Sequence, residues 1–284
     1  MTFNVWATPR EVVNYMQKER TEEIGKLIQV GEYDLYLLTE VWSDNYYNII
    51  KRYMPNGYHI TKFKELAAKG CQAGMDPNED RDLYRMEGCS GLLIISRYPI
   101  EEAPGVNGKF VEYLVHGEDP HEIPGGGYEM TGEKHATKGW GVIRIKPKIK
   151  YGDVTIDVFV THTCADPGVG DPTNAYYQIT RREKQIEQLI SEGVLKSTAD
   201  IIILGGDLNV PKPSDMFVEG YIHRKDKDKW EKEKSYNIIK KAMKNSMVDE
   251  HGDSWMERRN GIGTKQYATF NNPRNTHKDR YHAL

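Results

Sequence analysis

The segment "ADIIILGGDLNVP", residues 199–211, ends an apolar, β-branched run with two glycines, an aspartate and an asparagine. Its length and composition are typical of a buried strand in a sheet that is covered on both faces. Asp207 and Asn209 are the polar side chains that follow this strand. Gly, Asp and Asn are also what turns are made of, so the segment taken alone fits an ordinary turn as well.

Strand-like runs of the same kind recur along the chain and alternate with helix-like segments. The strand candidates are residues 33–40, 91–99, 139–146 and 154–163, and the helix candidates are residues 22–30, 43–54 and 171–190. This alternation predicts the α/β (α+β) class, with a mixed sheet or two packed sheets flanked by helices. Residues 64–90 are polar and contain glycine, which predicts a long surface loop, and the charge run 225–234 is typical of a solvated face.

Composition excludes several classes of protein. The 284 residues suit one large domain or two small ones, and the formal charge of -3 argues against affinity that depends on nucleic-acid phosphates. The three cysteines have no metal-type spacing, so they are most simply reduced thiols, with one disulfide pair left open. No apolar stretch has the length of a membrane span, and no signal peptide is visible.

Polar side chains stand where the expected strands stop. Asn4 lies in the apolar start of the chain, Glu40 ends one run, His162 ends another, and Asp207 and Asn209 end a third. Each of them alone fits a structural role, such as a cap, a salt bridge or a turn. Ligands collect outside strand ends in helix-covered sheets, so these residues have a reason to share one site. Together they fit a site for a hard cation and a phosphate, in which carboxylates hold Mg²⁺ and the imidazole and amide donate to phosphoryl oxygens.

Five ordered motifs carry a resemblance to a known family. They are "TFNVWA" (2–7), "LLTEVWSD" (37–44), "GCSGLLIISRYPI" (88–100), "THTCADP" (161–167) and "ILGGDLNVP" (203–211). In order and rough spacing they resemble the endonuclease/exonuclease/phosphatase superfamily. Within it, "NAYYQITRREKQIEQL" (174–189) and the "TEVW" run are more similar to the animal-type neutral sphingomyelinases than to the nucleases.

The resemblance implies a fold and a role for each residue. The fold is the four-layer α/β/β/α sandwich of the deoxyribonuclease-like superfamily, expected here as one catalytic domain over residues 1–284 with incomplete terminal strands. Glu40 would be the direct Mg²⁺ ligand, and Asn4 would hold the metal site from the first strand. His162 would hydrogen-bond the scissile phosphate, and Asp207 and Asn209 would position the attacking water and the phosphate.

The resemblance also implies an activity. The expected enzyme is a Mg²⁺-dependent phosphodiesterase that hydrolyses sphingomyelin to ceramide and phosphocholine by in-line attack of water. The alternatives are a nuclease or phosphoinositide phosphatase on the same fold, or a catalytically dead binding protein. A lipid substrate implies a membrane surface as partner, no nucleic acid, and an intracellular, membrane-associated location with an anchor in a missing C-terminal segment. The sequence does not give the oligomeric state.

The chain departs from the family pattern at its ends. The family finishes with a Ser-Asp-His turn whose His is the general base, and this chain contains no Asp-His dipeptide. His282 comes before the place where the final strands should begin. Asp249 and Asn275 fit the family's late segment, with Asn275 as a substrate-side amide, and they fit ordinary turns as well. We therefore expect a chain truncated at both ends, with weak or no activity, because general-base help contributes a factor of about 10² to 10⁴.

Overall fold

The computed structural model describes residues 1–7, 17–42, 44–63, 90–105, 110–114, 138–149, 152–164, 172–210 and 234–243. The chain divides into two units, the first formed by Met1–Thr163 with Ser191–Leu208 and the second by Cys164–Ile190 with Asn209–Leu284. Almost all of the expected loop 64–90 and the charge run 225–234 lie outside the described residues. The expectation of a single domain over the whole chain stays a prediction.

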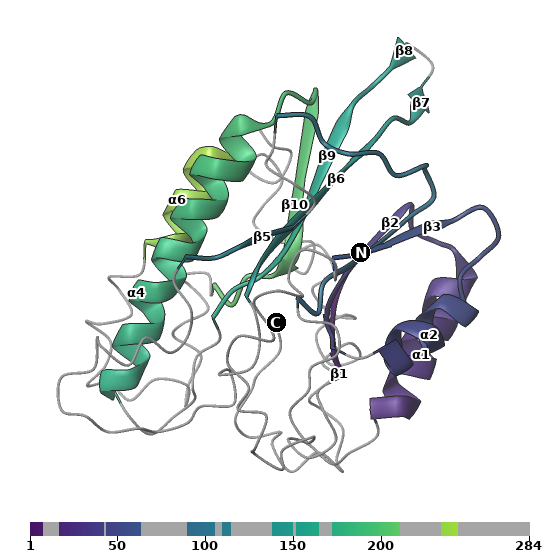
Figure 1. Ribbon diagram of the computed structural model, residues 1–284, viewed down its shortest axis with the longest axis horizontal. Helices are drawn as coiled ribbons and strands as arrows, with labels where there is room; N and C mark the ends of the chain where they lie inside the picture. Colours follow the sequence, from purple (N-terminus) through teal and green to yellow (C-terminus); the bar gives the residue numbers. More distant parts are fainter. Residues whose placement is uncertain are drawn as a thin grey trace, which may run out of the picture. The chain divides into compact units, whose positions relative to one another are not determined.

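Two four-stranded sheets form the framework of the first unit (Figure 1). The first sheet has the order β1-β2-β4-β3, with bounds β1 Thr2–Ala7, β2 Leu35–Val41, β4 Leu93–Ser96 and β3 His59–Lys62. The second has the order β10-β9-β6-β5, with bounds β10 Ile201–Asp207, β9 Ile156–His162, β6 Gly139–Ile145 and β5 Phe110–Glu112. The pairs β1–β2 and β10–β9 are parallel, and the other pairs are antiparallel. A small hairpin joins β7 Lys148–Ile149 to β8 Gly152–Asp153.

The core of the first unit has two parts, one on each face of the first sheet. Leu37 and Ile94 face the second sheet, where they cluster with Ile143 and Val158. The alternate positions on the same strands, such as Leu38, point the other way and pack against helices α1 (Gln17–Val30) and α2 (Asp44–Arg52). Because successive strand residues point to opposite faces, a strand covered on both sides must be apolar throughout. This is why β2 and β4 read as continuous apolar runs in the sequence.

The second unit contains the remaining α-helices that the structure describes, α4 (Pro172–Gln188) and α6 (Ser235–Ala242). Cys164, two residues beyond the end of β9, makes three hydrogen bonds with the described residues of α4, one of which Gln185 Nε2 donates to the Cys164 Sγ over 3.1 Å. Its N–H donates to Gln185 Oε1 over 2.8 Å, and its carbonyl accepts from Arg182 Nη1 over 3.1 Å. These bonds fix the segment that leaves β9 against α4.

The strand and helix predictions are confirmed at the places that the sequence indicated. The five expected strands correspond to β2, β4, β6, β9 and β10, although β2 runs one residue further than expected, to Val41, and the three expected helices correspond to α1, α2 and α4. The mixed α/β class with two sheets is confirmed as well. Among the described residues, no helix is long and apolar enough to cross a membrane.

Candidate active site

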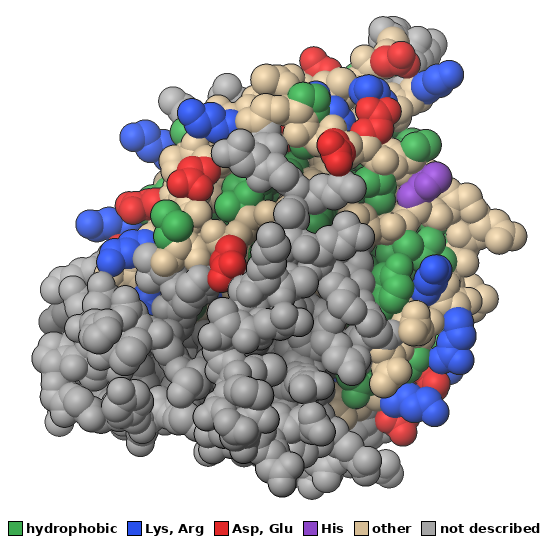
Figure 2. All heavy atoms as spheres, viewed as in Figure 1, with side chains coloured by type: hydrophobic (Ala, Val, Ile, Leu, Met, Phe, Trp, Pro, Cys, Tyr) green, Lys and Arg blue, Asp and Glu red, His purple; other side chains and the backbone are tan. Residues whose placement is uncertain are grey.

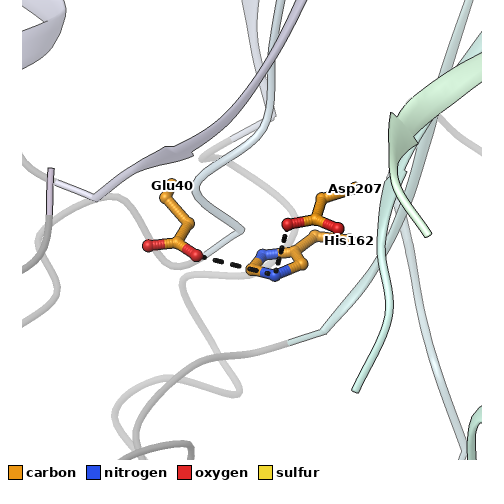
Figure 3. A group of neighbouring side chains, drawn as sticks. All are labelled: Glu40, His162 and Asp207. Carbon is orange, nitrogen blue, oxygen red and sulfur yellow. Dashed lines mark ion pairs between the residues drawn. The ribbon is translucent and has the colours of Figure 1, made fainter. Parts of the chain in front are cut away.

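Three side chains from three strands converge at one end of the two sheets of the first unit (Figure 3). Glu40 lies near the end of β2, and His162 and Asp207 are the last residues of β9 and β10. In the parallel register of β9 and β10, His162 and Asp207 stand opposite each other. His162 Nε2 lies 3.8 Å from Glu40 Oε1 and 3.8 Å from Asp207 Oδ2, and one ligand atom from each residue lies within 4.8 Å of the others.

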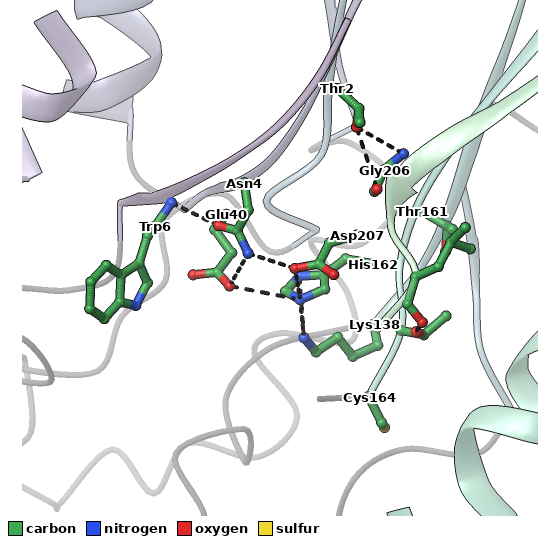
Figure 4. A network of polar contacts seen from close by, with 12 residues as sticks. Thr2, Asn4, Trp6, Glu40, Lys138, Thr161, His162, Cys164, Gly206 and Asp207 are labelled. Carbon is green, nitrogen blue, oxygen red and sulfur yellow. Dashed lines mark hydrogen bonds and ion pairs between the residues drawn. The ribbon is translucent and has the colours of Figure 1, made fainter. Parts of the chain in front are cut away.

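Asn4, from β1, links the two carboxylates (Figure 4). Its amide Nδ2 donates to Glu40 Oε1 over 2.8 Å and to Asp207 Oδ2 over 2.7 Å. Its Oδ1 accepts a hydrogen bond from the backbone N–H of Trp6 over 2.8 Å. Two neighbouring carboxylates repel each other, and a shared donor between them offsets part of that repulsion.

His162 is buried beside a lysine. Lys138 Nζ lies 2.9 Å from His162 Nε2 and 3.2 Å from Nδ1, and both residues are almost fully buried. Burial, and secondly the positive charge of Lys138, hold the pKa of His162 well below its ordinary value. The imidazole is therefore neutral, with one N–H donor and one acceptor nitrogen. The ring of Trp42 lies beside it, with the ring centroids 6.1 Å apart.

The backbone around the site adopts conformations that side chains rarely accept. Glu40 and Trp6 have φ of 59° and 49°, in the left-handed region, and neither is a glycine. The β1–β2 register shifts between Asn4 and Ala7, which is a bulge in β1. Bulges and left-handed residues re-aim side chains, and they persist only where the surrounding structure imposes them. Both strands that supply first-sheet residues to the site are thus distorted next to it.

The cluster has the donor chemistry that a hard divalent cation requires. Glu40 and Asp207 bring two carboxylates into a largely buried place, with side-chain exposures of 15% and 4%. Buried carboxylates are costly unless they are paired or coordinate a metal, and oxygen ligands are those that Mg²⁺ prefers. The residues present therefore fit the cation that the sequence predicts.

A family model described as the Endonuclease/Exonuclease/phosphatase family matches residues 1–280. The chain belongs to this family. The fold agrees with that membership, and the deoxyribonuclease-like architecture expected from the sequence is confirmed. No curated protein matches the chain.

Solved structures of the Endonuclease/Exonuclease/phosphatase fold resemble this chain. Sphingomyelinase C from Streptomyces griseocarneus is 16% identical, with 85% of this chain and 68% of that chain covered and a TM-score of 0.51. A mutant beta toxin from Staphylococcus aureus, with bound magnesium ions, is 17% identical. The match covers 85% of this chain and 68% of the toxin, with a TM-score of 0.52. At these identities the likeness shows the fold alone.

The structure brings together four of the five site residues expected from the sequence: Asn4, Glu40, His162 and Asp207. Asn209 lies two residues beyond β10, with a left-handed φ of 48°, and belongs to the second unit. The roles assigned to all five stay predictions. Asp249, Asn275 and His282 lie outside the described residues.

Lys138 is the site residue that the sequence reasoning missed. It stands directly before β6, and the antiparallel register pairs Gly139 with His162. Lys138, one position before the fully buried strand β6, therefore lies beside His162 at the end of β9. Pairing the expected strands 139–146 and 154–163 as antiparallel neighbours would have found it.

Proposed function

We propose that this chain is a Mg²⁺-dependent phosphodiesterase that hydrolyses sphingomyelin to ceramide and phosphocholine. The observation that carries the proposal is the convergence of Glu40, His162 and Asp207, with one ligand atom of each within 4.8 Å of the others. Two carboxylates and a neutral imidazole at the ends of neighbouring strands are suited to phosphate-ester chemistry that a hard cation assists.

Each side chain has a role that its surroundings support. Glu40 would hold Mg²⁺, which when bound polarises a phosphoryl oxygen as a Lewis acid. Asp207, next to the phosphate, would accept a hydrogen bond from the attacking water and orient it for in-line attack. His162, kept neutral by burial and by Lys138, would donate its ring N–H to a phosphoryl oxygen as negative charge develops there.

Lys138 would add positive charge on the same side. Its ammonium group lies within hydrogen-bond distance of both ring nitrogens of His162, so it can donate to whichever nitrogen carries no proton. Of the two histidines that the structure describes, His59 lies at the start of β3 and only His162 lies at the site.

The substrate class rests on resemblance. The animal-type motifs of the sequence and the likeness of fold to a bacterial sphingomyelinase both support sphingomyelin. The formal charge of -3 supports a substrate other than nucleic acid. On the face shown in Figure 2, basic and acidic side chains of the described residues are interspersed and form no broad basic patch among them. A lipid substrate would bring the protein to a membrane surface.

The test is phosphocholine release from sphingomyelin vesicles at increasing Mg²⁺ concentration, with Glu40→Gln as the background control. Abasic DNA and soluble inositol phosphates are run in parallel as substrates. The proposal expects slow Mg²⁺-dependent release from sphingomyelin, because the chain contains no Asp-His dipeptide to supply the family's general base. Chelation and Glu40→Gln should abolish that release. Faster hydrolysis of DNA or of inositol phosphates would assign a nuclease or a phosphatase instead. Binding to the vesicles without any hydrolysis would indicate a binding protein.

A further inference from the structure

Arg20, in the first turns of α1, reaches from the helix to the distorted part of β1. Its Nη1 donates to the carbonyl oxygen of Trp6 over 2.9 Å and to that of Val5 over 3.4 Å. Its guanidinium also lies over the Trp6 ring, 4.8 Å from the ring centroid. One side chain thus contacts both the backbone and the indole of the same residue.

The residue that Arg20 contacts is held in an unfavourable conformation. Trp6 has a φ of 49° at the bulge of β1, where the register with β2 shifts. A left-handed residue other than glycine costs about 1–3 kcal/mol and needs contacts that impose it. The hydrogen bond to the Trp6 carbonyl and the stacking on its ring are contacts of this kind.

The conformation of Trp6 determines which way the Asn4 amide faces. The Trp6 N–H points at Asn4 Oδ1 over 2.8 Å, which leaves Asn4 Nδ2 to face Glu40 Oε1 and Asp207 Oδ2. If the amide were rotated by half a turn, its oxygen would face two carboxylates and its NH₂ would face an N–H. The Trp6 N–H therefore selects the orientation in which the amide joins the two carboxylates.

Arg20 also acts on Glu40 through charge. Burial lowers the pKa of Arg20, and the negative charge of Glu40 opposes this change. The guanidinium is thus close enough to Glu40 for their charges to interact, while its hydrogen bonds act on the neighbouring strand.

We propose that Arg20 is a positioning residue for the metal site: it locks the β1 bulge at Trp6, and through it the Asn4 amide that spaces Glu40 and Asp207. The inference rests on the metal role in the proposed function, although Arg20 touches neither substrate nor cation. Side chains that orient metal ligands typically affect metal affinity by about 10- to 100-fold when they are replaced.

The experiment measures Mg²⁺ affinity by calorimetry in the whole chain, together with the melting temperature without metal. The variants are Arg20→Gln, Arg20→Lys, Asn4→Ala and the double variant Arg20→Gln/Asn4→Ala. Lys26→Gln is the matched control, because Lys26 is an exposed cation of the same helix that pairs with Glu23. We expect Arg20→Gln to weaken Mg²⁺ binding about tenfold. Arg20→Lys, which keeps the charge and one donor, should recover part of that loss.

The double variant separates positioning from general stability. If Arg20 acts through Asn4, Arg20→Gln adds little further loss of Mg²⁺ affinity once Asn4 is alanine. Equal Mg²⁺ affinity in Arg20→Gln and Lys26→Gln, or full additivity with Asn4→Ala, would overturn the inference. If Arg20→Gln does not fold, the Mg²⁺ affinity of Arg20→Lys is the test. An affinity equal to that of the unaltered chain would overturn the inference.

Measurements on the same samples distinguish a failure of this inference from a failure of the proposed function. Mg²⁺ binding without sphingomyelin hydrolysis by the unaltered chain contradicts the proposed substrate alone, and the calorimetric comparison still decides the role of Arg20. A chain that binds no Mg²⁺ at all overturns both.

Discussion

Asn4 commits both protons of its amide nitrogen to carboxylates, one on each sheet of the first unit. Such a group is hard to replace, because a buried carboxylate that loses its donor also lacks the water that would compensate it. The isosteric change Asn4→Asp exchanges that donor for a third negative charge beside Glu40 and Asp207.

We expect Asn4→Asp to lower the free energy of unfolding in metal-free protein by at least about 2 kcal/mol, because it removes two charge-assisted hydrogen bonds and adds repulsion. Mg²⁺ should restore part of this loss by compensating the added charge. Asn48→Asp, on the exposed side of α2, is the matched control and should change stability little. Urea denaturation with and without Mg²⁺ gives the four values. Equal losses in the two variants would contradict the role of Asn4.

His162 makes stability depend on pH in a defined direction. Its pKa in the folded protein lies well below the ordinary value of about 6.5, so the unfolded chain takes up the proton first as the pH falls. The contribution of the neutral His162 to the free energy of unfolding is complete above a pH of about 6.5. Below that pH it declines by about 1.4 kcal/mol per pH unit, until the pKa of the folded state is reached.

Urea denaturation at pH 7.5 and 5.5, in the presence of a chelator, measures this contribution. Between pH 7.5 and pH 5.5 the free energy of unfolding should fall by about 1.4 kcal/mol more in the unaltered chain than in His162→Gln. The reason is that glutamine takes up no proton in this range. The same loss in both proteins would show that His162 carries its proton in the folded state.

At the level of elements, the last residue but one of β10 is a glycine that the neighbouring strand requires. Gly206 has a φ of 118°, and a Cβ added to it would collide with the carbonyl oxygen of Thr161 on β9. Its N–H also donates to Thr2 Oγ1 over 3.1 Å, which joins β10 to the first sheet. The residue before Asp207 therefore allows β9, β10 and β1 to meet.

Gly206→Ala should lower the free energy of unfolding by roughly 3 kcal/mol or more, through backbone strain and the collision together. It should also weaken Mg²⁺ binding, because Asp207 is displaced. Gly57→Ala is the matched control: Gly57 has a φ of 83° and open space around it, so strain alone costs about 1–2 kcal/mol. Similar losses in the two variants, with Mg²⁺ affinity unchanged, would contradict the account of this strand end.

The sequence predicts the long strands well and the short ones poorly. β2 and β9 are apolar because they are covered, so their pattern is strong. β10 has an equally apolar run, but its residues before Asp207 are half-buried or exposed, so the expectation of a strand covered on both faces was wrong for it. β4 has only four residues, but it lies within the apolar run 91–99 and is fully buried. β3, with the mixed sequence HITK, and β5, with three residues, form no apolar run that stands out. The site residues follow the same pattern: Glu40, His162 and Asp207 end long apolar runs, and the sequence predicted them. Lys138 depends on strand register, and the left-handed Glu40 depends on contacts made far along the chain.

For the molecule as a whole, the site joins the two sheets of the first unit. Asn4 and Glu40 come from the first sheet, and Lys138, His162 and Asp207 belong to the second sheet or its edge. A cation held between them would bind only the folded chain, so it must stabilise folding in proportion to its affinity.

The melting temperature should therefore rise with Mg²⁺ concentration. At 100 times the dissociation constant, the gain is about 2.7 kcal/mol, which for a chain of this size is several degrees. Glu40→Gln, which removes the ligand charge, should melt at a temperature nearly independent of Mg²⁺. A rise of the same size in both proteins would place the cation elsewhere.

The most direct measurement is a crystal structure grown with Mn²⁺ in place of Mg²⁺, in which anomalous scattering locates the cation. We predict a peak about 2.1 Å from a carboxylate oxygen of Glu40, beside His162 and Asp207. A fully occupied peak away from Glu40, or no peak in crystals that hold Mn²⁺ at other places, would contradict the assignment of this cluster as the metal and phosphate site.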